Sequence, residues 1–420
     1  MLDFSQVVTQ IKEFGAERVR TLPLLENALH EASRRMREAR PNWEATRAKI
    51  DLGGTSWLVA RWLEPPDSVY NLPPRPLPHT VFAADGSQIV SDRHDIALCF
   101  LLNVGLIALR YGTGERASLT SRPQLDHADD ELLEEIEGQQ IAISPKRVAI
   151  RRLLAEFAGL SEMICGAEHT LSTEESDVQK TEGTSVRALT ESEIPIIALS
   201  DGTLILWTLD NETDAFRSKS LEAFQSSLEV GRTRGIPIVG YISSPQSRDV
   251  INSLRVHSCG FPKTDCDKNC PAASHPRPEY VAPKCAGTER VVDAELFALL
   301  LLPGQRSAVF GSRSTILDQY KAHNRIWFFY LHVGEEVARV EIPAWVAESE
   351  ALLDLTHTLC YDQACKGGGY PVALAEAHEQ AIVRNPERDA FFRLMERDFV
   401  HRHQSIASTQ KAISKRARRV

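Results

Sequence analysis

Two apolar runs that each end in an Asp-Gly step constrain this chain more than any other feature. Residues 81–89 read VFAADGSQI, and residues 194–204 read IPIIALSDGTL. The pattern predicts two buried strands that deliver Asp85 and Asp201 at their ends and then turn on a glycine. Carboxylates on neighbouring rigid strands are suited to binding Mg²⁺ or Mn²⁺, because hard cations prefer oxygen ligands. For one Asp-Gly step alone, an ordinary β-turn is the competing interpretation.

Composition narrows the class of protein. A chain of 420 residues fits two or three domains, or one elaborated α/β domain with a helical appendage. The net charge of −9 argues against binding nucleic acid through the overall electrostatic field of the protein. It is compatible with a local basic groove. The N-terminal sequence is acidic and amphipathic, and the longest apolar stretch is short for a membrane span. We therefore expect a cytoplasmic protein without membrane contact, whose eight cysteines are reduced thiols or metal ligands.

Periodicity and proline content predict how the chain is divided. The first 64 residues have helical periodicity, with a second segment opening at Leu22-Pro23-Leu24-Leu25, and we interpret them as an arm for a dimer or partner contact. The predicted division is a helical arm at 1–64, a Pro-rich linker at 65–80, a main domain at 81–400 with a polar insertion at 166–193 and a Cys-rich insertion at 257–287, and a basic tail at 401–420.

Within the main domain the pattern alternates strands and helices. We expect one long strand or a broken pair over 95–111, an acidic loop or helix face over 126–137, helices over 146–164 and 216–230, and a buried strand over 236–243. Strand, helix and strand with nearly continuous apolar strands predict a parallel pair inside a covered sheet. Residues 325–331 and 335–342 predict neighbouring antiparallel strands, the second alternating apolar and charged residues.

A glycine-rich turn near the C-terminus opens a further helix. Residues 367–371 read GGGYP, and the following helix carries Ala373, Ala377 and Ala381 on one small face, which permits close packing. His378 falls eight residues after Tyr370, so both lie on roughly the same side of the helix. A single histidine in such a helix is often only structural, but its pairing with Tyr370 favours a functional role.

Together, VFAADGS, ALSDGTL and GYPVALAEAH resemble the motifs of the NurA nucleases. The resemblance implies a ribonuclease-H-like mixed sheet flanked by helices, and action with the hexameric HerA ATPase on DNA ends. By this resemblance Asp85 and Asp201 match the two metal-binding aspartates, and Tyr370 and His378 match the tyrosine and histidine of the last motif. The remaining acidic position falls on Glu156, with Glu162 as the alternative.

These residues predict a Mn²⁺- or Mg²⁺-dependent deoxyribonuclease. A phosphodiester hydrolase needs an activated water and a compensated leaving oxygen, which two metal ions supply. Asp85, Asp201 and Glu156 would hold the metal, His378 would bind a metal or stabilise the leaving group, and Tyr370 would orient a phosphate. The resemblance further implies exonuclease activity with some single-strand endonuclease activity, in repair or in defence, by a homodimer docked to a HerA-like translocase. The alternative is a non-catalytic adaptor that binds DNA or the ATPase.

Four cysteines fall within one Pro-rich stretch, as Cys259-x₆-Cys266-x₃-Cys270-x₁₄-Cys285. In a reduced compartment little besides thiolate–metal bonds would organise such a loop, so we expect a zinc or iron–sulfur site, with His257 and His275 as possible substitute ligands. The spacing matches neither common zinc ribbons nor ferredoxin runs. Chance clustering and a redox-labile loop are the alternatives.

Basic residues predict a path for DNA. No P-loop motif opens a helix, so a partner must supply any ATP-driven movement. A local cationic surface would concentrate the field where the substrate enters. The candidate DNA-binding residues are Arg147, Arg151, Arg152, Arg306 and Arg313, with Lys411, Lys415, Arg416, Arg418 and Arg419 in the tail.

Overall fold

The computed structural model describes residues 3–55, 57–91, 98–128, 132–136, 139–167, 194–270 and 284–402. The chain forms two compact units: a first unit of Met1–Pro74 with Tyr241–Tyr361, and a second unit of Arg75–Gly240 with Asp362–Val420. Nearly all of the polar insertion, the middle of the Cys-rich insertion with His275, and the basic tail from residue 403 lie outside the described residues. Among the described helices, none is long and apolar enough to cross a membrane.

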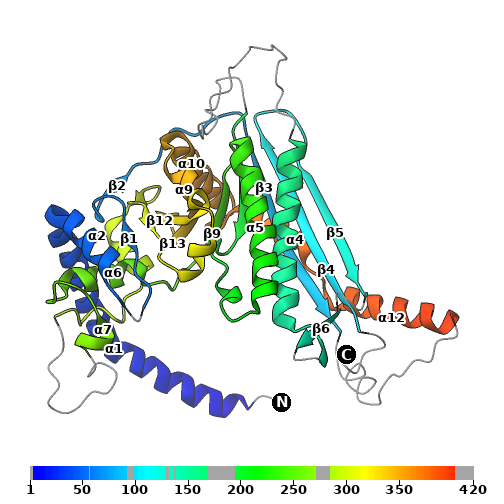
Figure 1. Ribbon diagram of the computed structural model, residues 1–420, viewed down its shortest axis with the longest axis horizontal. Coiled ribbons are helices and arrows are strands. Elements are labelled where there is room, and N and C mark those ends of the chain that lie inside the picture. The colour runs from blue at the N-terminus through cyan, green and yellow to red at the C-terminus, as the bar shows by residue number, and fades with distance from the viewer. Residues whose placement is uncertain are drawn as a thin grey trace. The chain divides into compact units, whose positions relative to one another are not determined.

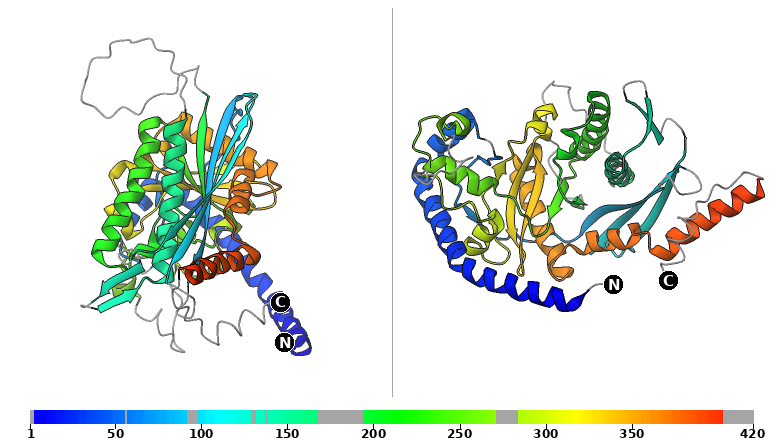
Figure 2. Two further views of the ribbon diagram at one scale, coloured as in Figure 1. Left: turned by 90° about the vertical axis from the view of Figure 1, so that its right-hand side faces the viewer. Right: turned by 90° about the horizontal axis from the view of Figure 1, so that it is seen from below.

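A mixed sheet forms the centre of the second unit (Figure 1). Its strands are ordered β9-β8-β3-β4-β5, with β3 parallel to β8 and antiparallel to β4. Helices α4 and α5 lie on one side of the strands, and α11 lies on the other (Figure 2). The elements of this unit are β3 (His79–Val90), β4 (Phe100–Tyr111), β5 (Ser118–Asp126), β6 (Leu133–Ile136), β7 (Gln139–Ala142), α4 (Pro145–Gly166), β8 (Ile196–Asp201), η2 (Trp207–Leu209), α5 (Asp214–Arg234), β9 (Ile238–Ile242, at the unit boundary), α11 (Val372–Ala381) and α12 (Asn385–His401).

The two Asp-Gly steps differ in structure. Asp201 is the last residue of β8, and Gly202 has a φ of +101°, so the predicted turn is confirmed there. At Gly86 the prediction is wrong, because β3 continues to Val90 and Gly86 pairs with Val104 on β4. The predicted long strand after it is continuous within β4 rather than broken near Asn103.

Small residues let helix α11 approach the sheet closely. Gly105 on β4 pairs with Asp85, and a Cβ there would lie 2.8 Å from the backbone nitrogen of Ala381. The predicted small helix face is confirmed, since Ala373, Ala377 and Ala381 are all buried. Asn103 Nδ2 donates to the Ala381 carbonyl at 2.8 Å, which ties the end of α11 to β4.

The first unit contains a second group of antiparallel strands. Strand β12 pairs with β13 over its full length, which confirms the predicted neighbouring strands. Its other neighbours are β11, which also pairs with β1, and β10, which also pairs with β2. The elements are α1 (Phe4–Ala39), η1 (Arg40–Asn42), α2 (Trp43–Leu52), β1 (Arg61–Trp62), β2 (Val69–Tyr70), α6 (Asp249–Ser258), α7 (Cys266–Asn269), α8 (Asp293–Leu300), β10 (Arg306–Ser307), β11 (Phe310–Gly311), η4 (Thr315–Gln319), η5 (Ala322–Asn324), β12 (Ile326–His332), β13 (Val337–Pro343), α9 (Ala344–Ala347) and α10 (Glu350–Lys366, at the unit boundary).

One expectation for the first unit is wrong. Pro23 does not separate two helices, because it lies inside the continuous α1, whose C-terminal half packs Ala32 and Met36 into the core of the unit. The helix therefore tolerates the loss of one backbone donor. The alternation of apolar and charged residues in β13 brings no charge to the surface there, since Arg339 and Glu341 are buried and pair with each other.

Candidate active site

Three carboxylates converge in the second unit. In the register of the parallel strands Ala84 pairs with Ser200, so Asp85 and Asp201 come next on adjacent strands. Glu156 reaches the same place from α4, where it is buried. Burial raises the pKa of Glu156 to about 8; Arg152 lowers it, whereas Asp85 and Asp201 add to the rise. The three carboxylates are therefore within electrostatic reach of one another.

Glu156 has an incomplete set of polar partners. Its Oε1 lies 3.3 Å from Arg152 Nε, yet neither atom has a hydrogen-bond partner among the described residues. Arg152 instead donates through Nη1 to the Gly86 carbonyl at 2.7 Å. A Cβ at Gly86 would collide with the Glu156 carboxylate, so glycine makes room for this side chain. A buried carboxylate oxygen without a donor is costly unless something else binds it.

Glu162, the alternative to Glu156, is placed elsewhere. Its side chain is 63% exposed and forms an ion pair with Arg122 on β5. Glu156 is thus the glutamate that the structure brings to the two aspartates, while Glu162 lies on the surface of α4.

Each aspartate has one partner from the last motif. His378 Nδ1 and Asp85 Oδ2 lie 2.8 Å apart, and the histidine side chain is 59% exposed. Burial raises the pKa of Asp201, while a hydrogen bond from Tyr370 lowers it and the charge of Asp85 raises it. The turn before α11 is tight, because a Cβ at Gly367 would collide with the Tyr370 carbonyl, and Gly369 has a φ of +117°. The glycine-rich turn therefore fixes where Tyr370 lies.

The predicted DNA-binding arginines have different surroundings. Arg147 is buried, donates to Glu212 at 2.6 Å and lies over the Phe216 ring. Arg306 of the first unit is also buried, between the rings of Tyr70 and Phe329. Arg313 donates to the Ile50 carbonyl. Arg151 and Arg152 lie on α4, the helix of Glu156, and unlike Arg147 on the same helix they are partly exposed.

The sequence did not reveal which residues position the candidate site. Sequence analysis treated Arg152 only as a DNA contact and Asn103 as a break in a strand, whereas Arg152 faces Glu156 and Asn103 anchors α11. A signal for Asn103 was present, because a polar side chain in an otherwise apolar strand usually has a specific partner.

The donor set suits a divalent hard cation. Among the described residues, no group of three or more His, Cys, Asp or Glu side chains already has the arrangement of a metal site. The three carboxylates nevertheless repel one another's charge, and one buried oxygen lacks a hydrogen bond. A cation bound by Asp85, Glu156 and Asp201 would remove both costs.

Comparison with known proteins identifies the family. The family model of the NurA domain matches residues 79–383, which is well over half of the chain. The chain belongs to the NurA domain family. The matched region holds all five candidate residues, from Asp85 to His378, so the site lies wholly inside the NurA domain.

The solved structures agree at the level of the fold. The NurA nuclease of Sulfolobus solfataricus matches with a TM-score of 0.51 and 11% identity, covering 96% of this chain and 98% of that one. This likeness confirms the mixed α/β fold with helices flanking a mixed sheet. LC9-RNase H1 matches with a TM-score of 0.21 and 10% identity, over 43% of this chain and 71% of that one, and no argument rests on it. A search of curated proteins found no match.

Proposed function

We propose that this NurA-domain protein is a nuclease that hydrolyses phosphodiester bonds in DNA with Mn²⁺ or Mg²⁺. Membership of the family and the likeness to a NurA nuclease support a nuclease function. The observation that carries the metal dependence is the buried Glu156 oxygen without a hydrogen bond beside Asp85 and Asp201. We also propose that the domain is of the ribonuclease-H type, as its motifs imply.

The side chains have separable tasks in this proposal. Asp85, Glu156 and Asp201 would hold the metal, which when bound activates water and compensates charge on the leaving oxygen. Asp85 Oδ2 fixes the imidazole of His378 through Nδ1 at 2.8 Å, which leaves Nε2 to hold or deliver a proton at the leaving group. Tyr370 donates to Asp201 and so holds its hydroxyl where it can orient a phosphate.

Substrate and partners belong to the same proposal. We propose exonuclease activity with some single-strand endonuclease activity, in which Arg151 and Arg152 on α4 contact the DNA backbone. We further propose a homodimer that works with a HerA-like hexameric ATPase in processing DNA ends. The first half of α1 supports a protein contact, because Phe4, Ile11 and Phe14 are each at least 60% exposed.

A nuclease assay on end-labelled DNA with Mn²⁺, Mg²⁺ or chelator tests this function. Asp85→Asn should abolish metal-supported cleavage while leaving DNA binding and the denaturation midpoint unchanged. Asp214→Asn is the matched control, because the Asp214 side chain is 91% exposed on α5, where it forms an ion pair with Arg217. Unchanged cleavage by Asp85→Asn would overturn the assignment. A wild-type chain that is inactive with both metals, yet binds a translocase tightly, would favour the adaptor.

A further inference from the structure

Hydrogen bonds hold the cysteine-bearing segments of the first unit against its N-terminal helices. Cys259 follows α6, and its carbonyl accepts from Lys49 Nζ on α2 at 2.5 Å. Cys266 donates its backbone N–H to the Gly54 carbonyl at 3.3 Å, and Gly54 donates to the Thr264 carbonyl at 2.8 Å. Two segments that are far from α2 in sequence are thus held beside its C-terminal end.

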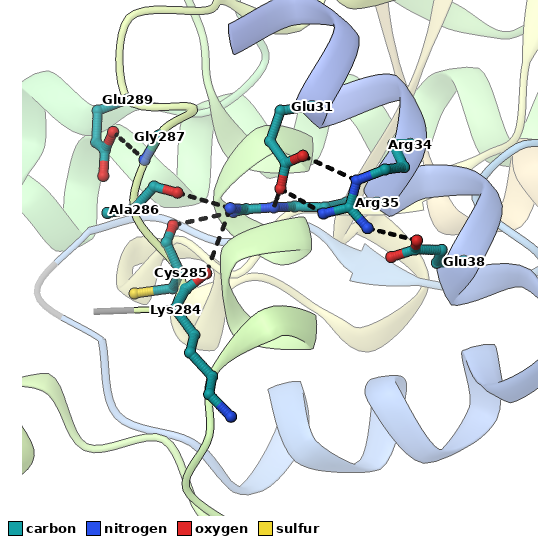
Figure 3. Close-up of polar contacts among 9 residues, drawn as sticks. All are labelled: Glu31, Arg34, Arg35, Glu38, Lys284, Cys285, Ala286, Gly287 and Glu289. Carbon is teal, nitrogen blue, oxygen red and sulfur yellow. Dashed lines mark hydrogen bonds and ion pairs between the residues drawn. The ribbon is translucent and has the colours of Figure 1, made fainter. Parts of the chain in front are cut away.

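Arg35 on α1 holds the segment that carries Cys285 (Figure 3). Its guanidinium donates to three successive carbonyls: Lys284 at 3.3 Å, Cys285 at 3.0 Å and Ala286 at 2.6 Å. Arg35 is buried, and Glu31 accepts from its Nε at 2.7 Å. Hydrogen bonds with Arg34 and Arg35 outweigh burial and lower the pKa of Glu31 to about 2, so the acceptor stays charged. A buried arginine therefore fixes a loop segment that has no regular structure of its own.

The thiols themselves lie in one neighbourhood. Cys266 is the first residue of α7 and Cys270 directly follows its last, with Cys270 N–H donating to the Cys266 carbonyl at 3.0 Å. The side chains of Cys259, Cys266, Cys270 and Cys285 are all half-buried. Burial raises the pKa of Cys285; Arg255 lowers it, and the charges of Cys259 and Cys270 raise it. Geometry also brings two of these segments together, because a Cβ at Gly260, next to Cys259, would lie 3.8 Å from the side chain of Lys284, next to Cys285. Cys259 and Cys270 are thus each within electrostatic reach of Cys285.

We propose that Cys259, Cys266, Cys270 and Cys285 bind one Zn²⁺ ion as a tetrahedral thiolate site. Four cysteines are a complete ligand set for a structural zinc ion. Positions i and i+4 on one face of a helix are a spacing that holds zinc in other proteins, and this favours a single ion over an iron–sulfur cluster. His257 is not required, because its Nδ1 is already paired with Thr46 Oγ1 at 2.8 Å.

Binding changes both protonation and side-chain positions. Each thiol gives up its proton as its sulfur bonds to zinc, so binding releases protons and weakens as pH falls. No group of three such side chains among the described residues is already arranged around a metal, so the thiols must turn toward a common centre. The backbone anchors from Arg35, Lys49 and Gly54 limit that movement to the side chains. The site is structural and independent of Asp85, so it does not rest on nuclease activity.

Metal analysis of the purified full-length chain, grown with added zinc, tests the proposal. We expect one zinc ion per chain in the wild type and in Cys365→Ser, whose cysteine is exposed and belongs to the second unit. Cys285→Ser should weaken zinc binding by at least about 10-fold, the lower end of the cost of disturbing a metal site. Asp85→Asn should keep its zinc, which separates this proposal from the nuclease assignment.

Thiol titration of the wild type gives a second test that does not depend on whether the Cys285→Ser variant folds. With zinc bound, four thiols should react slowly in the native protein and become reactive when a chelator removes the metal. Absence of zinc, zinc retained in full by Cys285→Ser, or disulfides among these cysteines would overturn the site. Iron with visible absorbance would overturn zinc as its occupant.

Discussion

Each unit contains a cluster of carboxylates, and the two clusters differ in how many hydrogen bonds their oxygens receive. In the first unit Arg339 donates to Asp249 and to Glu341, each at 2.9 Å. Asp293 beside them accepts from the backbone N–H groups of Val250 and Ile251 at 3.0 and 2.8 Å. Tyr330 adds a third donor to Asp293 at 2.8 Å. The carboxylates of this cluster therefore have partners from their own unit.

The cluster of the second unit is not closed in this way. Asp85, Glu156 and Asp201 share Arg152 as a nearby cation, and Glu156 Oε1 has no hydrogen bond from any described residue. His378 reaches Asp85 from an exposed position rather than from a core. Glu156 Oε1 is thus near a cation but receives no hydrogen bond, unlike the oxygens of Asp293 in the first unit.

A raised pKa does not separate the two clusters. Burial is the largest cause of both shifts, raising the pKa of Asp293 to about 7 and that of Glu156 to about 8. Perturbed carboxyl groups occur in structural networks as well as in active sites. What distinguishes Glu156 is an oxygen without a hydrogen bond. Buried polar groups whose hydrogen bonds are all made stabilise a fold, whereas a buried group that lacks one calls for an explanation such as a bound ion.

Replacing Arg339 by Met should have the largest effect on stability. The change leaves Asp249 and Glu341 buried without their cation, which costs about 3–5 kcal/mol. Urea denaturation measures the loss, and Arg325→Met is the control, because the Arg325 side chain is 51% exposed in its pair with Asp318. A loss below about 1 kcal/mol would mean that the closed cluster is not structural.

Replacing Glu156 by Gln should give the opposite result. Glutamine keeps the size of the side chain and removes a charge that Asp85 and Asp201 oppose, so stability should change by less than about 1 kcal/mol. Mn²⁺-supported cleavage should fall more than about 100-fold, beyond the cost of losing an outer partner of a metal. Glu162→Gln is the control on the same helix. If Glu156→Gln unfolds the protein as Arg339→Met does, the contrast between the clusters is wrong.

The pH dependence of stability separates Glu156 from Asp293. Because the folded pKa of Glu156 is raised from 4.5 to about 8, its protonation contributes stability below pH 4.5 that is lost as pH rises through 8. In metal-free protein we expect this loss at up to about 1.4 kcal/mol per pH unit. Asp293 contributes in the same direction up to about pH 7. Glu156→Gln should remove its share of the slope between pH 4.5 and about 8, which denaturation at several pH values will show. Between about pH 7 and 8, above the pKa of Asp293, the wild-type slope comes from Glu156 and not from Asp293, so identical curves for wild type and variant there would contradict the raised pKa.

The sequence predicted what depends on neighbours along the chain. The Asp201-Gly202 turn, the small face of α11 and the pairing of β12 with β13 all follow from local pattern, and the structure has them. The identical Asp-Gly step at Gly86 is not a turn, because β4 continues to pair beyond it and glycine is needed there for Glu156.

What the sequence could not predict depends on distant partners. The alternation in β13 predicted a strand, but it could not show that Arg339 pairs with Asp249, 90 residues away, and that both are buried. Spacing likewise could not choose between Glu156 and Glu162, because both lie on α4 and only packing against Gly86 separates them. A one-dimensional pattern records which residues are polar and does not record which of them meet.

A matched pair of tyrosines gives the smallest and sharpest contrast. Tyr330 is fully buried and its hydroxyl contacts Asp293 and Ser247, each at 2.8 Å, so Tyr330→Phe removes a hydrogen bond to a buried carboxylate and should cost about 1–3 kcal/mol. Tyr370 donates a hydrogen bond to Asp201 at the exposed end of β8, so Tyr370→Phe should change stability by no more than about 0.5 kcal/mol.

The cleavage rate should fall in Tyr370→Phe and stay unchanged per folded molecule in Tyr330→Phe. Both variants remove one hydroxyl next to one aspartate, so the two measurements together ask whether that hydroxyl stabilises the fold or serves the reaction. Equal stability losses would show that the two carboxylate clusters are built alike, and the distinction between a closed and an open cluster would then fail.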